Sequence, residues 1–214
     1  MTRTVMDPET RRSELIDTAE KLFLENGYEG TTVSEIVRNA GVAQGTFYHY
    51  FKSKDEVLSA ITDRWIEEIR AGIEDIASRD DSDAIDKILS VFSFFSSLGM
   101  SKQGLVEYFH MERNAHLHIK FEKSVPQIII PPFSRMIEEG VDAGFFDVRY
   151  PEMAALSVMK TAGAIFHIHE TCRLEDETEK MKEVTDATFD FIERILGAEP
   201  GIFMEYVSKM EKSA

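Results

Sequence analysis

Apolar residues recur at steps of three and four along most of the chain, which is the period of an amphipathic α-helix. The first such stripe lies within Pro8–Glu25, where the proline suits a first helical turn and Asp7 an N-cap. Asn26-Gly27 follows, and glycine readily adopts the left-handed conformation that often ends a helix. The pattern therefore predicts a first helix that stops at this dipeptide.

Two shorter helices are predicted next. Thr32, with Glu35 three residues later, has the spacing of a capping box and predicts a helix that runs to Ala40. Gly41 interrupts the pattern, and a further helix is predicted over Ala43–Phe51. Two short helices joined by a tight turn that contains glycine are typical of a helix-turn-helix.

The helical pattern continues through the rest of the chain. Ser53 is placed to cap a long helix that ends near Ser78. Further helices are predicted over Ser82–Ser97, Lys102–Asn114, Val125–Ala143, Pro151–Cys172, Asp176–Leu196 and from Pro200 onwards. No window combines alternating β-branched residues with a hairpin turn. The sequence thus predicts an all-α protein of about nine or ten helices.

Three prolines fall within one predicted helix. Pro126, Pro131 and Pro132 each lack a backbone donor, so we expect them to bend or interrupt that helix. The segment Gly140–Arg149 is predicted to be a loop.

One segment carries a recognisable signature. Residues Thr31–Lys54, which read TTVSEIVRNAGVAQGTFYHYFKSK, closely resemble the DNA-binding segment of the TetR family of transcriptional regulators. The likeness covers about residues 9–58 without a gap and includes the preceding Ala19, Leu22, Phe23, Gly27 and Tyr28. It implies an N-terminal three-helix domain, residues 1–55, that binds DNA, and a larger helical bundle, residues 56–214, that binds a ligand and dimerises.

A recognition helix must approach base edges closely, which favours small and hydrogen-bonding side chains at its start. Gln44 is the residue best suited to read an adenine edge. Tyr48 and His49 can donate to phosphate oxygens, as can Thr32 and Lys54 at the starts of their helices. The candidate DNA-binding residues are Thr32, Ala43, Gln44, Gly45, Thr46, Tyr48, His49 and Lys54.

The other side of the same short helix is aromatic. Phe47, Tyr50 and Phe51 fall partly on the face opposite to the candidate contacts. Aromatic clusters of this kind are more often core than contact surface. We therefore expect these rings to seat the helix against the first two helices.

Two later helices, at residues 151–172 and 176–196, are suited to pair with a second copy of the chain. The first is apolar almost all round its middle, from Ala162 to Phe166, so it must be covered on several sides. The second carries an apolar stripe made of Val184, Ala187, Thr188, Phe191, Ile192 and Ile195. In the TetR family the corresponding helices form a four-helix dimer interface, so the resemblance implies a homodimer that reads a palindromic operator.

Large apolar side chains of the second domain could line a pocket for a small hydrophobic effector, or they could form an ordinary core. The candidates are Phe92, Phe95, Tyr108, Phe109, Met111, Phe133, Met136, Met159 and Phe166. Nothing in the pattern names the effector. The resemblance implies a repressor that such a ligand releases from DNA.

A formal net charge of −15 is unfavourable for a nucleic-acid partner, whose phosphates require local positive charge. The distribution of charge changes that conclusion. Residues 1–54 carry 7 Lys and Arg against 8 Asp and Glu, whereas residues 55–214 carry 17 against 31. Between Ile36 and Lys54 the formal charges are Arg38, Lys52 and Lys54, so we expect a small cationic face on an acidic body.

Other features indicate a cytoplasmic protein. No segment approaches the roughly 18 consecutive apolar residues that span a bilayer. Met1–Arg12 lacks the apolar core of a signal peptide, and a single cysteine, Cys172, cannot form an internal disulfide. We expect no membrane partner.

A small helical enzyme or a metal-dependent protein is the alternative function. It depends on five histidines in the second domain: His110, His116, His118, His167 and His169. Chelating pairs on a helix stand at i and i+4, and these histidines offer no second ligand at that spacing. An acid–base site around His167 and Glu170 can be imagined, but no nucleophile elbow, phosphate loop or zinc helix motif accompanies it. We therefore expect no catalysis, metal or cofactor.

Overall fold

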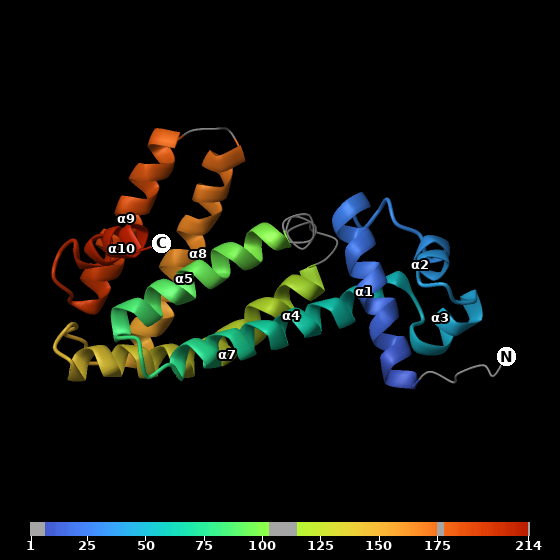
Figure 1. The fold of residues 1–214 in the computed structure, drawn as a ribbon, viewed down its shortest axis with the longest axis horizontal. Helices are drawn as coiled ribbons and strands as arrows, with labels where there is room; N and C mark the ends of the chain where they lie inside the picture. The colour runs from blue at the N-terminus through green and yellow to red at the C-terminus, as the bar shows by residue number, and fades with distance from the viewer. Residues whose placement is uncertain (1–6, 103–114, 175–177, 214) are drawn as a thin grey trace. The chain divides into compact units, whose positions relative to one another are not determined.

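The computed structural model describes residues 7–102, 115–174 and 178–213. The regular structure in these ranges is entirely helical (Figure 1), which confirms the all-α class. The helices are α1 (Pro8–Asn26), α2 (Val33–Asn39), α3 (Gln44–Tyr50), α4 (Lys54–Ala77), α5 (Ala84–Ser101), α7 (Ala115–Asp142), α8 (Pro151–Leu174), α9 (Thr178–Leu196) and α10 (Ile202–Ser213). Within the described residues, no helix is long and apolar enough to cross a membrane.

The chain forms two compact units. The first contains the chain up to Ile69 together with Ser96–Val125, and the second contains Arg70–Phe95 together with Pro126–Ala214. Helices α4, α5 and α7 therefore each contribute residues to both units. The functional division after residue 55 stays a prediction.

Local signals define the first two helices as the sequence predicts. Asp7 accepts a hydrogen bond from the Thr10 amide at 3.2 Å, and α1 ends at Gly27, whose φ is +73°. At the start of α2, the Thr32 hydroxyl accepts from the Glu35 amide at 3.2 Å, and the Glu35 carboxylate accepts from the Thr32 amide at 2.8 Å. Both halves of the capping box are therefore formed.

The core of the first unit is built from α1 to α4. Phe23, Phe47 and Phe51 are each almost completely buried, together with Leu15 and Ile36. Burial of one such side chain contributes about 1.5–3 kcal/mol relative to exposure. The expectation that Phe47 and Phe51 seat the short third helix is confirmed.

Stacked aromatic rings occupy the core of the second unit. The ring of Phe203 lies between those of Phe146 and Phe189, with centroid distances of 6.3 and 5.9 Å. The buried Glu193 accepts hydrogen bonds from the amides of Gly201 at 2.8 Å and Phe203 at 3.2 Å, which holds the start of α10 against α9. Helices α8 and α9 lie side by side (Figure 1).

The proline segment departs from the sequence prediction. Helix α7 begins at Ala115, earlier than the predicted Val125, and continues through Pro126, Pro131 and Pro132 to Asp142. Of the two expected outcomes, an interruption is wrong, whereas a bend stays a prediction. Each proline removes one backbone donor, but the neighbouring Ile129 and Phe133 are buried in the core, and this burial offsets the lost hydrogen bonds.

Other helix limits differ by a few residues. Helix α5 runs to Ser101 and α8 to Leu174, each a little beyond its predicted end. The helix predicted over Lys102–Asn114 lies, apart from Lys102 itself, outside the described residues.

Candidate DNA-binding site

Helix α3 presents one face to solvent and the other to the core. Phe47 is completely buried, whereas the next residue, Tyr48, is 52% exposed. The ring of Tyr48 meets that of Phe47 edge-on, with 5.4 Å between centroids, so the buried ring fixes the exposed one. The remaining candidates of this segment are placed on the solvent side: Ala43, Gln44, Gly45 and His49 are exposed, and Thr46 is half-buried.

The first turn of α3 is uncrowded. Ala43 precedes it in an extended conformation and makes no side-chain cap, while the Thr46 amide donates to the Ala43 carbonyl at 2.9 Å. A Cβ added at Gly45 would meet nothing within 4 Å. Small side chains in this turn allow the helix backbone to come close to the base edges of a DNA groove. Gln44 is the longest polar side chain of the turn.

The side chain of Thr32 is engaged locally. Its hydroxyl donates to the Glu35 carboxylate at 2.8 Å in addition to its capping role. The backbone and side-chain hydrogen bonds from Thr32 lower the pKa of Glu35 below its ordinary value. A phosphate contact of Thr32 would therefore share the hydroxyl with a carboxylate, and this candidate stays a prediction.

Lys54 is also engaged. Its ammonium donates to the carbonyls of Tyr28 at 2.6 Å and Thr31 at 2.8 Å and lies 4.0 Å from the centre of the Tyr28 ring. Burial lowers the pKa of Lys54, while the charges of Glu29 and Asp55 oppose that shift. The structure thus places Lys54 beneath the loop between α1 and α2.

The other two cations of the +3 stretch are exposed. Arg38 lies in the last turn of α2, and Lys52 lies between α3 and α4. Within the described residues the Lys52 ammonium makes no ion pair or hydrogen bond, whereas its amide donates to Glu56 at 2.5 Å. Neither residue belongs to the predicted set, although the run of positive charge in the sequence was a signal that could have added them.

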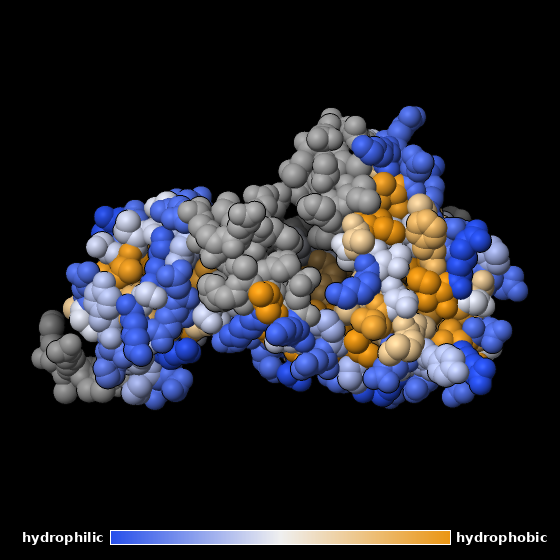
Figure 2. All heavy atoms as spheres, turned by 180° about the vertical axis from the view of Figure 1, so that it is seen from behind, coloured by the Kyte–Doolittle hydropathy of each residue, from blue (hydrophilic) through white to orange (hydrophobic). Residues whose placement is uncertain are grey.

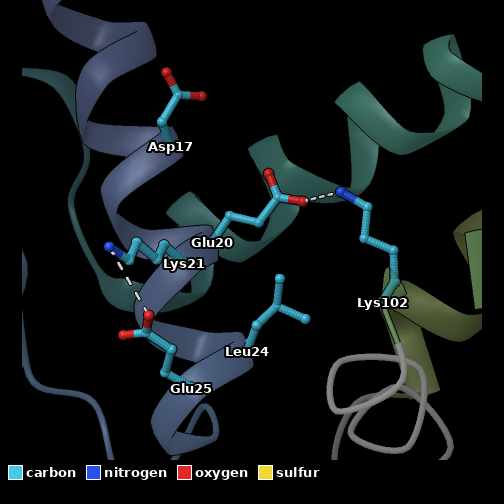
Figure 3. A pocket seen from close by; sticks show the side chains of 6 residues that line it. All are labelled: Asp17, Glu20, Lys21, Leu24, Glu25 and Lys102. Carbon is cyan, nitrogen blue, oxygen red and sulfur yellow. Dashed lines mark hydrogen bonds and ion pairs between the residues drawn. The ribbon is translucent and has the colours of Figure 1, made fainter. Parts of the chain in front are cut away.

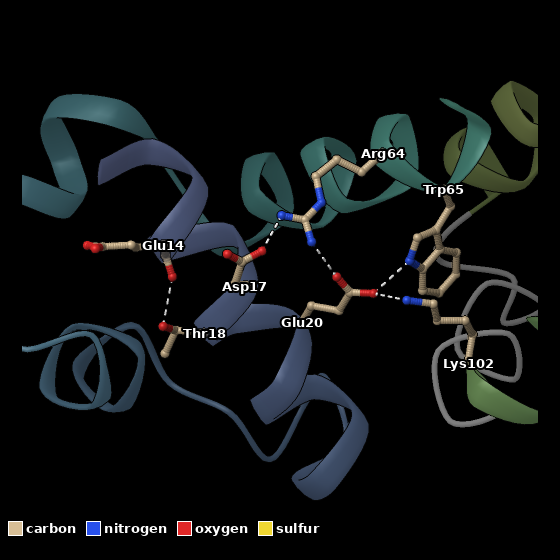
Figure 4. Close-up of polar contacts among 7 residues, drawn as sticks. All are labelled: Glu14, Asp17, Thr18, Glu20, Arg64, Trp65 and Lys102. Carbon is tan, nitrogen blue, oxygen red and sulfur yellow. Dashed lines mark hydrogen bonds and ion pairs between the residues drawn. The ribbon is translucent and has the colours of Figure 1, made fainter. Parts of the chain in front are cut away.

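A carboxylate on α1 holds this region against α4 (Figure 4). Glu20, only 7% exposed, accepts hydrogen bonds from Arg64 at 2.8 Å, from the Trp65 indole at 2.8 Å, and from Lys102. Arg64 also pairs with Asp17. Burial alone would raise the pKa of Glu20, but the hydrogen bonds from Lys102 and Trp65 and the nearby charges lower it overall. No motif or periodicity in the sequence indicates this cluster, whose members lie on separate segments.

A shallow hollow of about 370 Å³ adjoins the cluster (Figure 3). Its lining is mainly charged and includes Asp17, Glu20, Lys21, Leu24, Glu25 and Lys102. Five of these six residues are charged, and Glu20 and Lys102 form an ion pair there, so the hollow offers few apolar side chains to a hydrophobic molecule.

The predicted effector residues of the second domain have different environments. Phe133 and Met136 are buried in the core, and Phe92, Phe95 and Met159 are half-buried. Tyr108, Phe109 and Met111 lie outside the described residues, as does the side chain of Phe166. The pocket therefore stays a prediction.

Apolar side chains gather on one face of the second unit, over α8 and α9 (Figure 2). Met153 on α8 is 54% exposed and Phe191 on α9 is 48% exposed. The predicted stripe of α9 divides into two faces, because Ile192 is buried inside the unit while Val184, Thr188 and Ile195 are half-buried beside Phe191. Among the side chains described, this outward face is the exposed one.

No group of three or more histidine, cysteine or acidic side chains is placed to hold a metal among the residues described. The side chains of the five histidines considered above lie outside that set.

Comparison with known proteins gives one family. Residues 15–61 match the model of the family described as bacterial regulatory proteins, tetR family. The chain is 30% identical over 139 residues to the fatty acid metabolism regulator protein of Bacillus subtilis (strain 168). The matched region covers 61% of this chain and 68% of the relative. It is 29% identical over 112 residues to the HTH-type transcriptional repressor KstR2 of Mycobacterium tuberculosis (strain ATCC 25618 / H37Rv), 52% of each chain. The chain spans about half the length, or less, of the first curated relatives that it matches.

A solved structure extends the likeness over most of the chain. The transcriptional regulator FadR from Bacillus subtilis, in complex with stearoyl-CoA, has a TM-score of 0.60 over 86% of this chain and 97% of that chain, at 23% identity. This likeness shows a shared fold.

Two short helices joined by the turn at Gly41, the second seated by buried aromatic rings, give the first unit the arrangement of a helix-turn-helix. The chain belongs to the TetR family of bacterial regulatory proteins, which confirms the resemblance seen in the sequence. Its relatives are named as transcriptional regulators and repressors, so the comparisons favour a regulator over the alternative of an enzyme.

Proposed function

We propose that the chain is a transcriptional repressor that binds its operator as a homodimer and leaves it when an apolar small molecule binds the second unit. The observation that carries the proposal is the outward face of α3, where Gln44, Gly45, Tyr48 and His49 are exposed above a buried Phe47. Insertion into a major groove requires a helix that is held in place by core packing on one face and exposed to solvent on the other.

Each exposed residue has a role in the proposal. Gln44 reads an adenine edge with its amide, and the small Ala43 and Gly45 allow the helix to come close. Tyr48 and His49 donate to phosphates and set the register without reading sequence. Sequence preference therefore depends on Gln44 more than on the other candidates.

Dimerisation supplies the second recognition helix. The outward faces of α8 and α9, with Met153 and Phe191 half-exposed, support an interface made by these two helices and their copies. Two linked recognition helices raise the effective concentration of each at its half-site, which offsets the unfavourable net charge of the chain. The operator is accordingly a palindrome.

The effector is proposed from the chain's relatives. FadR from Bacillus subtilis was crystallised with stearoyl-CoA, and a Bacillus subtilis relative is named as a regulator of fatty acid metabolism. A long-chain acyl-CoA is therefore the first probe to use. It can release the repressor only by binding more tightly to the conformation that does not fit the operator. We place this activity in the cytoplasm.

The DNA part of the proposal is tested by fluorescence anisotropy with labelled DNA from upstream of the chain's own gene. Gln44→Ala should weaken binding to that DNA by about 5- to 150-fold for each half-site and leave binding to unrelated DNA unchanged, because each protomer of the dimer loses one base contact. Gln127→Ala, at an exposed position of α7, is the matched control and should change neither. An unchanged preference in Gln44→Ala would refute the assignment.

The effector part is tested separately with stearoyl-CoA. Binding is measured by calorimetry, and the operator affinity is then measured with and without the ligand. Release requires both binding and a loss of operator affinity. If stearoyl-CoA binds and the operator affinity does not change, induction by this ligand is wrong, while DNA binding is unaffected.

A further inference from the structure

Lys54 opens α4, and its charge invites assignment as a phosphate ligand. Its ammonium is instead directed inward, to the carbonyls of Tyr28 and Thr31 at 2.6 and 2.8 Å. These carbonyls lie at the two ends of the turn that joins α1 to α2. Two of the three ammonium donors are thus satisfied by backbone.

The aromatic ring beneath the ammonium strengthens the arrangement. The Lys54 nitrogen lies 4.0 Å from the centre of the Tyr28 ring, within the range of a cation–π contact. The hydroxyl of the same tyrosine donates to Asp55 at 2.6 Å, so Tyr28 is bound to two consecutive residues of α4. Turn and helix are joined by four contacts through three side chains.

The clamped turn leads directly into the capping box of α2. Thr31 is buried, and its hydroxyl donates to the carbonyls of Leu22 at 3.1 Å and Gly27 at 2.9 Å. Thr32, the next residue, is the N-cap of α2. A displacement of the turn would therefore move the beginning of α2.

We propose that Lys54 is a positioning residue, which clamps the turn before α2 to the start of α4, and that Lys52 supplies the phosphate contact at this place. The inference rests on the proposed DNA-binding function. Lys52 is exposed two residues earlier and, within the described part of the chain, its ammonium has no partner. A free cation loses little on meeting a phosphate, whereas Lys54 would have to abandon two backbone carbonyls.

Salt dependence distinguishes the two lysines. Each phosphate contact adds about 0.9 to the slope of log affinity against log salt concentration, so a dimer that loses two contacts should lose about 1.8. Lys52→Met should show this reduction with an unchanged unfolding midpoint. Lys54→Met should keep the slope, unfold at lower urea concentration, and lose at least about fivefold in preference for upstream over unrelated DNA, since the reading residues are displaced.

Lys54→Arg is the conservative variant, because it keeps the charge and the donors. It should recover the DNA preference in part, which a general loss of stability would not predict. If Lys54→Met proves too unstable to purify, NMR of the lysine ammonium groups in the wild type also shows which of the two lysines contacts DNA. The Lys54 signal should be protected from exchange in the free protein and should not shift when DNA is added, while the Lys52 signal shifts.

The inference is overturned if the salt slope of Lys54→Met falls as that of Lys52→Met does, or if the Lys54 ammonium signal shifts with DNA. Unchanged preference in a folded Lys54→Met would overturn it as well. Failure of the wild type to bind DNA would overturn the proposed function and this inference together, whereas the former results leave the proposed function standing.

Discussion

The indole nitrogen of Trp65 on α4 donates a 2.8 Å hydrogen bond to the carboxylate of Glu20 on α1, 45 residues earlier in the chain. The same carboxylate meets Arg64 and Lys102, so one buried acid joins three segments of the first unit. A buried carboxylate is stable only when its charge is compensated and its oxygens are hydrogen-bonded. Both conditions are met, and the integrity of the unit depends on them.

Replacement of Glu20 should therefore be costly. Glu20→Gln removes the charge that compensates Arg64 and Lys102 and is expected to lower the free energy of unfolding by about 1–3 kcal/mol. The measurement is urea unfolding followed by Trp65 fluorescence at neutral pH. Glu25→Gln, at an exposed position on the same helix, should change stability by less than about 0.5 kcal/mol. Equal stabilities of the two variants would contradict the account.

The contribution of Glu20 should depend on pH. Its pKa in the folded protein lies below the ordinary value of 4.5. Its stabilisation is therefore complete above pH 4.5 and is lost as the pH falls below that value through the folded pKa. The gap in stability between wild type and Glu20→Gln should be constant from pH 7 to pH 5.5 and narrow in more acid solution. A gap that widens there would show the opposite shift.

The turn between α2 and α3 depends on Gly41, whose φ is +66°. A Cβ at this position would meet no atom within 4 Å, so Gly41→Ala introduces backbone strain without a clash. We expect a loss of about 1–2 kcal/mol in urea unfolding. Gly45→Ala is the matched control, since Gly45 is helical with equally open surroundings, and it should be stabilising by about 0.5–1 kcal/mol. If both substitutions act alike, the left-handed turn is not what requires glycine.

The outward face of α9 is testable by oligomeric state. Phe191→Asp places a charge at the centre of the proposed dimer face and should convert dimers to monomers in light scattering after gel filtration, because an unpaired charge is costly to bury. Ile119→Asp on α7, where the native side chain is equally exposed at 48%, should leave the dimer intact. Dimers that persist in Phe191→Asp would exclude this face.

Tyr48→Phe removes the hydroxyl proposed to contact phosphate and keeps the ring against Phe47. Affinity should fall about 2- to 10-fold for each protomer of the bound dimer, for upstream and unrelated DNA alike, since a backbone contact carries no sequence information. Tyr50→Phe, at a half-buried position of the same helix, should leave both affinities unchanged. A selective loss for upstream DNA in Tyr48→Phe would indicate base reading.

Features determined by neighbouring residues were predictable from the sequence. The capping box of Thr32 and Glu35 and the turn at Gly41 involve residues a few positions apart, so the nearby sequence determines their geometry. The burial of Phe47 beneath the exposed Tyr48 followed from the helical period.

Features that join distant segments were not predictable. Glu20 and Lys102 are 82 residues apart, and no periodicity relates them. Lys54 was assigned by its charge and its place at a helix start, whereas its actual neighbours, Tyr28 and Thr31, come from a turn more than 20 residues away. The tertiary fold determines whether a lysine at a helix start faces solvent or packs against another segment. The pattern of charges along the sequence does not contain this information.

In and beside helix α3, residues close together in the chain belong to two different environments, the core and the solvent-exposed face. Phe47 and Phe51 hold the helix, while Gln44, Tyr48 and His49 face outward and contribute little to the core. Mutations at the outward positions should therefore accumulate in related genes without loss of folding, and under the proposed function a change at Gln44 alters which promoter is preferred. The same scaffold is open to the evolution of new regulatory targets through a handful of surface substitutions.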